Sequence, residues 1–200
     1  MLLRSRDTSS LVIDTLGDWA KGRNAAVACF YFDFAAQKEQ SAMSVLGSLL
    51  NQVVRGLEEI PAKIAQAFRD QKNVIGGRRL ELSEIVEMLQ DISSLRPTFI
   101  CIDALDECTV ESRMELLESL KQVLRKSPSI RIFLAGRSQI RNDVEKCLSG
   151  RVIPLSIIPT KNDIIRFLRA KLKKDPTPEA MDECLEEDII KNIPETVSKM

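Results

Sequence analysis

One short stretch, Pro97 to Cys108, constrains the possible folds more than any other part of the sequence. It opens with the wholly apolar run Phe99–Ile102, and a run this short is typical of a strand that is buried on both faces. It closes on three carboxylates, Asp103, Asp106 and Glu107. A buried strand that ends in acids places them at the rim of an α/β sheet, where the ligands of such sheets bind.

Acids in this position usually hold a hard cation, commonly Mg²⁺ that also carries nucleotide phosphates. We therefore predict a metal site at Asp103, because this residue precedes any plausible start of the next helix. The alternative is that the acids simply begin that helix, where negative charge suits the helix dipole. Asp106 and Glu107 fit this alternative well.

The rest of the chain alternates strands with helices, which predicts an α/β fold with a mainly parallel sheet between helices. We expect four strands, near residues 26–34, 98–103, 130–136 and 152–158, and the apolar run from Ala25 to Phe34 indicates a central one. Helical spacing of apolar residues predicts helices over residues 8–20 (capped by Ser9 or Ser10), 41–57, 61–72, 82–95, 110–126, 141–148 and 162–173, and over 178–200 with a break at Pro194. Thr160 and Asp163 resemble a capping box, and Gly76–Arg79 is expected to be a surface turn.

The charge balance argues against two classes of partner. Lys plus Arg equals Asp plus Glu at 29 each, so no basic field favours nucleic acid or a membrane surface. Aromatic residues make up only 4% of the chain, too few for a base-stacking platform. The start of the sequence is too weakly apolar for a signal peptide, and no apolar stretch is long enough to span a bilayer. We expect a soluble, cytoplasmic protein.

Histidine is absent, which excludes Ser-His-Asp and Cys-His catalysis and histidine-ligated metals. The chain has five cysteines, and no pair has the spacing of a zinc or redox motif. Cys29 and Cys101 lie inside apolar strands. Free, mostly buried thiols in a reducing compartment are therefore expected.

Polar groups follow three of the predicted strands: Asp33, the cluster Asp103/Asp106/Glu107, and Arg137. The carboxyl ends of parallel strands lie side by side, so these groups should converge. An acid that holds Mg²⁺, a second acid that polarises water and an arginine that faces a phosphate form a phosphoryl-transfer set. Two alternatives remain open: Arg137 forms an ion pair with one of the acids, and Asp33 is an ordinary loop residue.

Three segments resemble NACHT-type signal-transduction P-loop NTPases of the STAND class. Phe99–Cys108 is similar to their Walker B segment, and Val27–Phe34 resembles the second strand of the fungal branch, often called nephrocystin-like N-terminal domains. Ile130–Ser138 is similar to the sensor-1 strand. The resemblance implies a three-layer αβα P-loop NTPase-like core that binds Mg²⁺ and ATP or GTP. It also implies that Asp103 holds the metal, that Asp106 and Glu107 are catalytic, and that Arg137 contacts the nucleotide.

The sequence departs from this family at the phosphate-binding loop. Relatives carry a Gly-rich loop that ends in Gly-Lys-Ser/Thr directly before the first helix, and its amides and lysine hold the phosphates. Here Arg4-Ser5-Arg6 stands at that place, and no glycine precedes Gly17. We therefore expect a truncated core without the first strand and the Walker A loop, with impaired nucleotide binding and negligible hydrolysis.

We expect the truncated core to span residues 1–158 and a C-terminal helical segment to span 159–200. A second hypothesis is a non-enzymatic interaction module that forms a homo-oligomer or pairs with intact NACHT proteins. A receiver-like domain with Asp103 as phosphoacceptor is disfavoured, because the lysine expected after a later strand is absent.

Overall fold

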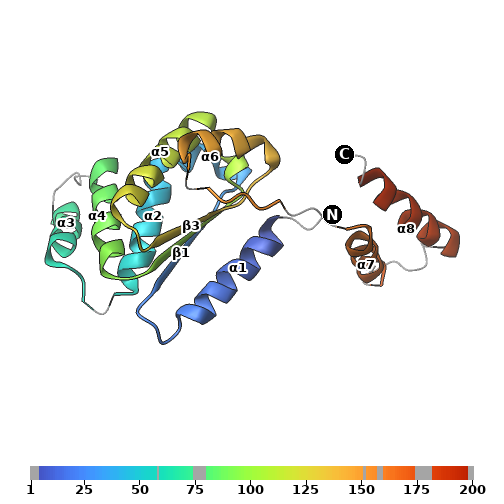
Figure 1. Cartoon of the computed structure of the whole chain (residues 1–200), viewed down its shortest axis with the longest axis horizontal. Coiled ribbons are helices and arrows are strands. Elements are labelled where there is room, and N and C mark those ends of the chain that lie inside the picture. The colour runs from blue at the N-terminus through green and yellow to red at the C-terminus, as the bar shows by residue number, and fades with distance from the viewer. Residues whose placement is uncertain are drawn as a thin grey trace. The chain divides into compact units, whose positions relative to one another are not determined.

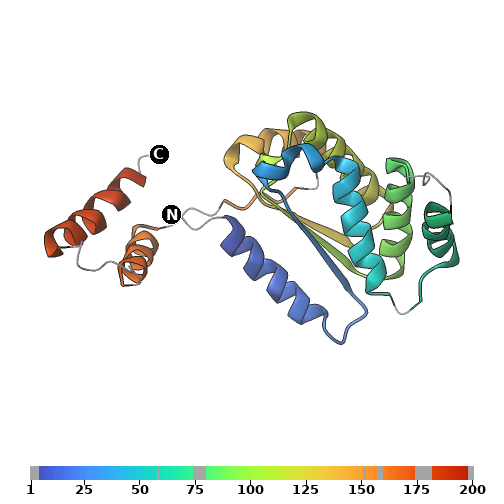
Figure 2. The ribbon, with the colours of Figure 1, turned by 180° about the vertical axis from the view of Figure 1, so that it is seen from behind.

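The computed structural model describes residues 5–57, 59–73, 80–150, 152–156, 160–173 and 182–197. The chain divides into two compact units, Arg4–Val152 and a second unit that contains Ile153–Met200. Figures 1 and 2 show opposite sides of both units. In order, the elements are α1 (Ser5–Ala20), β1 (Ala26–Tyr31), the 3-10 turn η1 (Phe34–Glu39), α2 (Ala42–Arg55), α3 (Ala62–Asn73), α4 (Leu82–Leu95), β2 (Thr98–Asp103), η2 (Leu105–Glu107), α5 (Val110–Lys126), β3 (Ile130–Leu134), η3 (Ser138–Ile140), α6 (Arg141–Cys147), α7 (Lys161–Leu172) and α8 (Glu183–Val197).

The first unit is built on a parallel sheet of three strands in the order β1-β2-β3. Helix α1 covers one face, where Trp19 meets Phe99 edge-on with ring centroids 5.3 Å apart, and α2, α4 and α5 lie on the other face (Figure 1). The predicted α/β fold with a parallel sheet between helices is confirmed.

The apolar run that ends in Asp103 forms β2, the middle strand of this sheet. Alternate residues of each strand enter the core beneath α2 and α5, as Ile100 and Ile102 do on β2. The helices begin where the sequence supplies caps: the Ser41 hydroxyl accepts the Ser44 N–H, and the Thr109 hydroxyl accepts the Ser112 N–H. The start of α5 at Val110 therefore confirms the predicted helix start.

Two strand predictions are wrong. Residues 152–156 form no strand, and Ile153 and Leu155 are 94% and 79% exposed. Apolar composition alone does not make a strand, because the backbone also needs a partner. Strand β1 lies at an edge of the described sheet rather than at its centre. Only Ala26 and Ala28 of β1 are buried, and Tyr31 at its end is exposed, as suits an edge strand.

Two helix predictions also need correction. Helix α1 begins at Ser5, so Ser9 and Ser10 lie inside it and do not cap it. Helix α8 continues through Pro194, which comes only a turn before the helix ends and is itself buried. The capping box is confirmed: the Thr160 hydroxyl accepts the Asp163 N–H, and the Asp163 carboxylate accepts the Thr160 N–H. Gly76–Arg79 lies outside the described residues.

None of the described helices combines the length and the apolar character that crossing a membrane requires.

Candidate functional site

Asp103 ends the middle strand β2 and is only 1% exposed. Its Oδ1 accepts the N–H of Ala104 at 2.8 Å, whereas its Oδ2 is buried and has no hydrogen-bond partner. Buried carboxylate oxygens are normally hydrogen-bonded, so an unpaired one marks a place where a cation or water would fit. This is the residue for which the sequence predicted a metal.

The backbone directly after Asp103 is strained. Ala104 has φ 54° and ψ 39°, the left-handed region that residues with a Cβ rarely adopt. The turn redirects the chain into η2, where the Leu105 N–H donates to the Ala135 carbonyl at 3.0 Å. The ends of β2 and β3 are therefore tied together at this point. Strain of this kind is found at functional strand ends more often than elsewhere.

Asp106 faces the end of β3. Its Oδ1 accepts the backbone N–H of Arg137 at 3.1 Å, and its Oδ2 lies 3.4 Å from Arg137 Nε. The Asp106 side chain is 6% exposed and that of Arg137 76% exposed. The alternative that Arg137 pairs with an acid is thus what the structure shows, although the guanidinium still faces solvent.

Gly136 makes this approach possible. A Cβ at this position would lie 2.7 Å from Ile140 Cδ1 and 3.1 Å from Asp106 Oδ1. A side chain here would displace the Ile140 and Asp106 side chains, which fill the space between the β3 end and the η2 turn. The sequence analysis did not single out Gly136; a glycine directly after a strand, next to a polar residue, is the signal for such a close approach.

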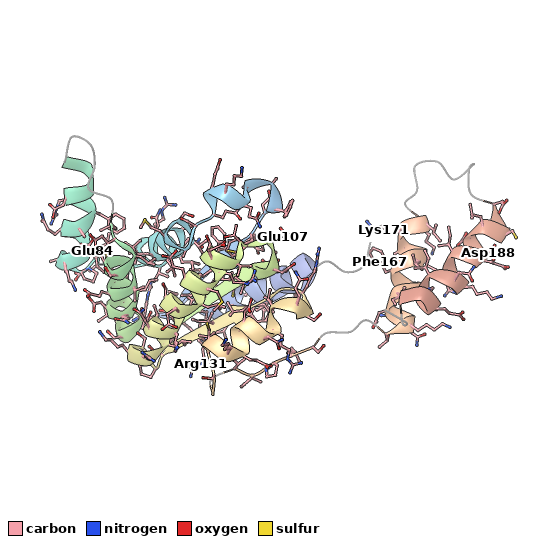
Figure 3. All side chains as sticks on the ribbon, turned by 90° about the horizontal axis from the view of Figure 1, so that it is seen from above. Glu84, Glu107, Arg131, Phe167, Lys171 and Asp188 are labelled. Atoms are coloured by element: carbon pink, nitrogen blue, oxygen red, sulfur yellow. The ribbon has the colours of Figure 1, made fainter. Side chains whose placement is uncertain are left out.

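Glu107 points toward η1 rather than toward Asp103; Figure 3 labels it. Its Oε2 accepts the Phe34 N–H at 3.0 Å, and its carbonyl accepts the Gln37 side-chain amide at 2.8 Å. Asp33 caps η1 through the Ala35 N–H at 3.0 Å, so it is a loop residue, as the second open alternative held.

The predicted convergence of the carboxylates is therefore only partial. Within the described ranges, no three His, Cys, Asp or Glu side chains group closely enough to hold a metal ion. The acids separate because each is bound by a different neighbour: Asp106 by Arg137 and Glu107 by Phe34. Of these three acids, only Asp103 has a buried oxygen without a hydrogen-bond partner. A Mg²⁺ ion fits this single ligand, since Mg²⁺ in nucleotide sites usually takes one or two carboxylates and fills its other positions with phosphate and water.

The α1-side face of the sheet surrounds Asp103 with weakly polar groups. Tyr31 pairs with Asp103 across the β1–β2 ladder. Burial is the main cause that raises the pKa of Tyr31, and the neighbouring Cys29 and Asp103 add to it. Burial also raises the pKa of Cys101 to about 11, so this thiol stays neutral. The Tyr31 hydroxyl and the Cys101 thiol beside Asp103 therefore supply no counter-charge to its carboxylate.

Two buried arginines that the sequence did not single out hold elements together, Arg113 beyond the carboxyl end of β2 and Arg96 before its amino end. Arg113, which is 8% exposed, donates to Asp143 Oδ2 at 2.9 and 3.0 Å and to the Cys108 carbonyl at 3.0 Å. It joins α5, α6 and the end of the acidic segment. Arg96 donates to the Gly56 and Val53 carbonyls at the end of α2, and burial lowers its pKa.

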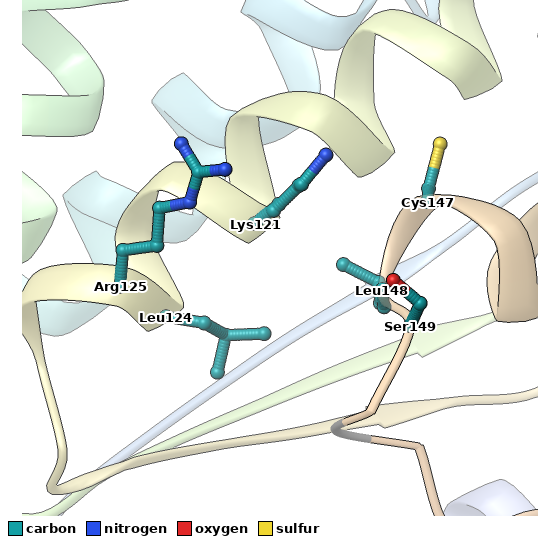
Figure 4. Close-up of a pocket in the computed structure, with 6 residues that line it drawn as sticks. All are labelled: Lys121, Leu124, Arg125, Cys147, Leu148 and Ser149. Atoms are coloured by element: carbon teal, nitrogen blue, oxygen red, sulfur yellow. The ribbon is translucent and has the colours of Figure 1, made fainter.

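A pocket of about 190 Å³ lies between α5 and the end of α6 (Figure 4), apart from every predicted site residue. Its lining is Lys121, Leu124, Arg125, Cys147, Leu148 and Ser149. Lys121 is already paired with Glu118 at 3.1 Å. The pocket is therefore not part of the strand-end site.

Comparisons with known proteins agree with this picture at the level of the family. The family model described as "Nephrocystin 3, N-terminal" matches residues 8–137. No curated protein matches the chain. Among solved structures, a Walker-type ATPase of Pyrococcus abyssi is similar over 97% of this chain and 58% of its own, with 16% identity and a TM-score of 0.47. The chain thus spans little more than half of that protein, and a likeness this low assigns no activity.

Proposed function

Since the chain belongs to the family of the nephrocystin 3 N-terminal domain, we propose that it is an NTPase-related core of a signalling protein, with impaired nucleotide binding and hydrolysis. The observation that carries the proposal is the buried, unpaired Oδ2 of Asp103 at the end of the middle strand. It supports a role for Asp103 in holding Mg²⁺ with a nucleotide phosphate. When bound, Mg²⁺ would neutralise phosphate charge and orient the phosphates.

The other roles follow from the contacts of each side chain. The Arg137 guanidinium is mostly exposed and would face a phosphate. Glu107 and Asp106 would position water, but both already accept hydrogen bonds from backbone N–H groups, which hold them away from Asp103. These contacts engage one oxygen of Glu107 and both oxygens of Asp106, and they orient the two carboxylates toward Phe34 and Arg137.

Electrostatic repulsion is the reason for which we expect weak nucleotide binding. A triphosphate brings several negative charges close to Asp103 and Asp106, and the sequence contains no Gly-Lys-Ser/Thr segment whose amides and lysine would offset them. Each charge-assisted hydrogen bond not made costs about 1.5–3 kcal/mol of binding. Three such contacts would weaken binding by roughly three to six powers of ten.

The test is a phosphate-release assay with ATP and with GTP, with and without Mg²⁺. We expect no turnover above that of the Glu107→Gln and Asp103→Asn variants. Mg²⁺-dependent turnover that disappears in Glu107→Gln would overturn the claim of impaired hydrolysis, while leaving the assignment of Glu107 in place.

A second candidate function is pairing with further copies or with intact NACHT proteins. The outer position of β1 and β3 in the described sheet supports it.

A further inference from the structure

The pocket of about 190 Å³ between α5 and the end of α6 has no role in the strand-end site. One of its walls is a face of α5 that carries Lys121, Leu124 and Arg125, which are spaced three and four residues apart and so lie on one side of the helix. The other wall is formed where α6 ends (Figure 4). Both helices belong to the unit Arg4–Val152, so the pocket lies within a single compact body.

Part of the pocket lining is apolar. Leu148 and Cys147 are only 6% and 8% exposed and belong to the hydrophobic core, and the half-buried Leu124 packs against the same core. An apolar cavity of roughly 150 Å³ is large enough to take a benzene molecule. The volume of this pocket therefore suits an apolar body the size of one ring, with room for a small head group.

The polar part of the lining is positively charged. It comprises Lys121, Arg125 and the Ser149 hydroxyl, and none of the six described lining residues is an acid. Lys121 shares its charge with Glu118, because Lys121 Nζ lies 3.1 Å from Glu118 Oε2. Arg125 is exposed, and a guanidinium presents a planar fork of N–H donors that matches the oxygens of a carboxylate or a phosphate. The lining thus combines an apolar surface with donors for a negatively charged group.

We propose that this pocket binds a small organic anion. Its ring-sized apolar body contacts Leu124 and Leu148, and its carboxylate or phosphate head group pairs with Arg125 and Lys121. Neither part is sufficient alone, because a neutral ring gains only the apolar contacts and an exposed ion pair contributes at most about 1 kcal/mol. A mainly apolar lining with a few convergent polar groups is the usual form of a small-molecule site.

The helix dipole alone would also account for cations at this end of α5, since cationic side chains in the last turn of a helix are stabilising without any ligand. Arg125 and Lys126 both lie in that last turn, but only Arg125 lines the pocket. A role limited to the dipole makes the two residues equivalent. A role in ligand binding makes Arg125 necessary and leaves Lys126 without effect.

The test is an NMR titration of the whole chain without Mg²⁺, followed at the backbone amide of Ser149. The probes are benzoate and phenyl phosphate, which combine a ring with an anionic head group, benzyl alcohol, which has the ring without the charge, and acetate, which has the charge without the ring. We expect the better anionic ring to bind with a dissociation constant of about 1 mM, and its head group identifies the class of ligand. Benzyl alcohol and acetate should each bind at least about fivefold more weakly.

The variants locate the binding site. Arg125→Gln should raise the dissociation constant of the better probe about three- to fivefold. The matched control Lys126→Gln removes a charge from the same turn of α5 and should leave the constant unchanged. Asp103→Asn should also leave it unchanged, which separates this pocket from the proposed nucleotide site.

Three results would overturn the proposal. The first is that neither anionic ring binds at concentrations of roughly tenfold the expected dissociation constant. The second is that benzyl alcohol or acetate binds as tightly as the better anionic ring. The third is that Arg125→Gln and Lys126→Gln have equal effects on the dissociation constant, which would leave the helix dipole as the role of Arg125.

Discussion

At the scale of single residues, Gly136 shows how little space separates the ends of β2 and β3. Gly136→Ala would press a methyl group against Ile140 and the Asp106 carboxylate. We expect the free energy of unfolding to fall by about 1–3 kcal/mol, the usual cost of overpacking. Urea denaturation measures it.

The control for this substitution is Gly17→Ala. Gly17 lies inside α1 with no atom within 4 Å of a new Cβ, so alanine should stabilise the protein by about 0.5–1 kcal/mol. The two glycine-to-alanine substitutions are thus expected to change the free energy of unfolding in opposite directions. A Gly136→Ala variant as stable as the wild type would show that the two strand ends separate easily.

Thiol reactivity is a second prediction at this scale. Burial raises the pKa values of Cys101 and Cys108 to about 11, so at pH 7.5 both remain thiols, which are poor nucleophiles. Cys184 is exposed. We expect an aromatic disulfide reagent to modify Cys184 rapidly in the native protein, and to reach Cys101 and Cys108 only after unfolding. The rapid phase should vanish in Cys184→Ser; if it persists, the half-buried Cys29 or one of the buried thiols is accessible.

The sequence singled out Asp103, Asp106, Glu107 and Arg137 as candidate site residues, because ligands bind at the carboxyl ends of parallel strands. That prediction needs only the order of strands and helices along the chain. The sequence did not show which neighbour each of these side chains contacts. Whether Glu107 faces a ligand or the Phe34 N–H depends on where η1 passes, which involves residues far apart in the chain. For the same reason Arg96 and Arg113 were missed, because their roles exist only once helices have packed on strands.

At the scale of elements, local patterns predicted the described helices, the bounds of β2 and the start of β3 well. They failed where the outcome depends on a neighbour: residues 152–156 have the apolar composition of a strand but form none, and β1 has the apolar run of a central strand but lies at an edge. Capping residues were reliable at Thr109 and Thr160, since a cap is satisfied by the residues that follow it.

The capping box of α7 gives a pH prediction. Hydrogen bonds from the Thr160 hydroxyl and then from its backbone N–H lower the pKa of Asp163 below its ordinary value of 3.8. A lowered pKa in the folded state means that the cap contributes its full stability above the ordinary pKa and loses it as pH falls through the lowered one. We expect the NMR titration midpoint of the Asp163 carboxyl to lie below 3.8 and to rise in Thr160→Val. A midpoint that Thr160→Val leaves unchanged would remove Thr160 as the cause.

At the scale of the whole molecule, the family and the α/β fold are established, and we propose that the strand-end site supplies only the metal-binding half of a nucleotide site. Asp103 offers an unpaired acceptor for a cation, whereas the sequence supplies no Gly-Lys-Ser/Thr segment for the phosphates. An acidic strand end without phosphate donors should bind a metal–nucleotide complex weakly, and only through the metal.

The most direct test of this account is a calorimetric titration of the chain with Mg²⁺-ATP and Mg²⁺-GTP, repeated with Asp103→Asn and with EDTA. The account predicts weak binding, with a dissociation constant of about 1 mM or higher, corresponding to about 4 kcal/mol or less, that is lost in Asp103→Asn and without Mg²⁺. Micromolar binding, or binding that survives Asp103→Asn, would contradict it.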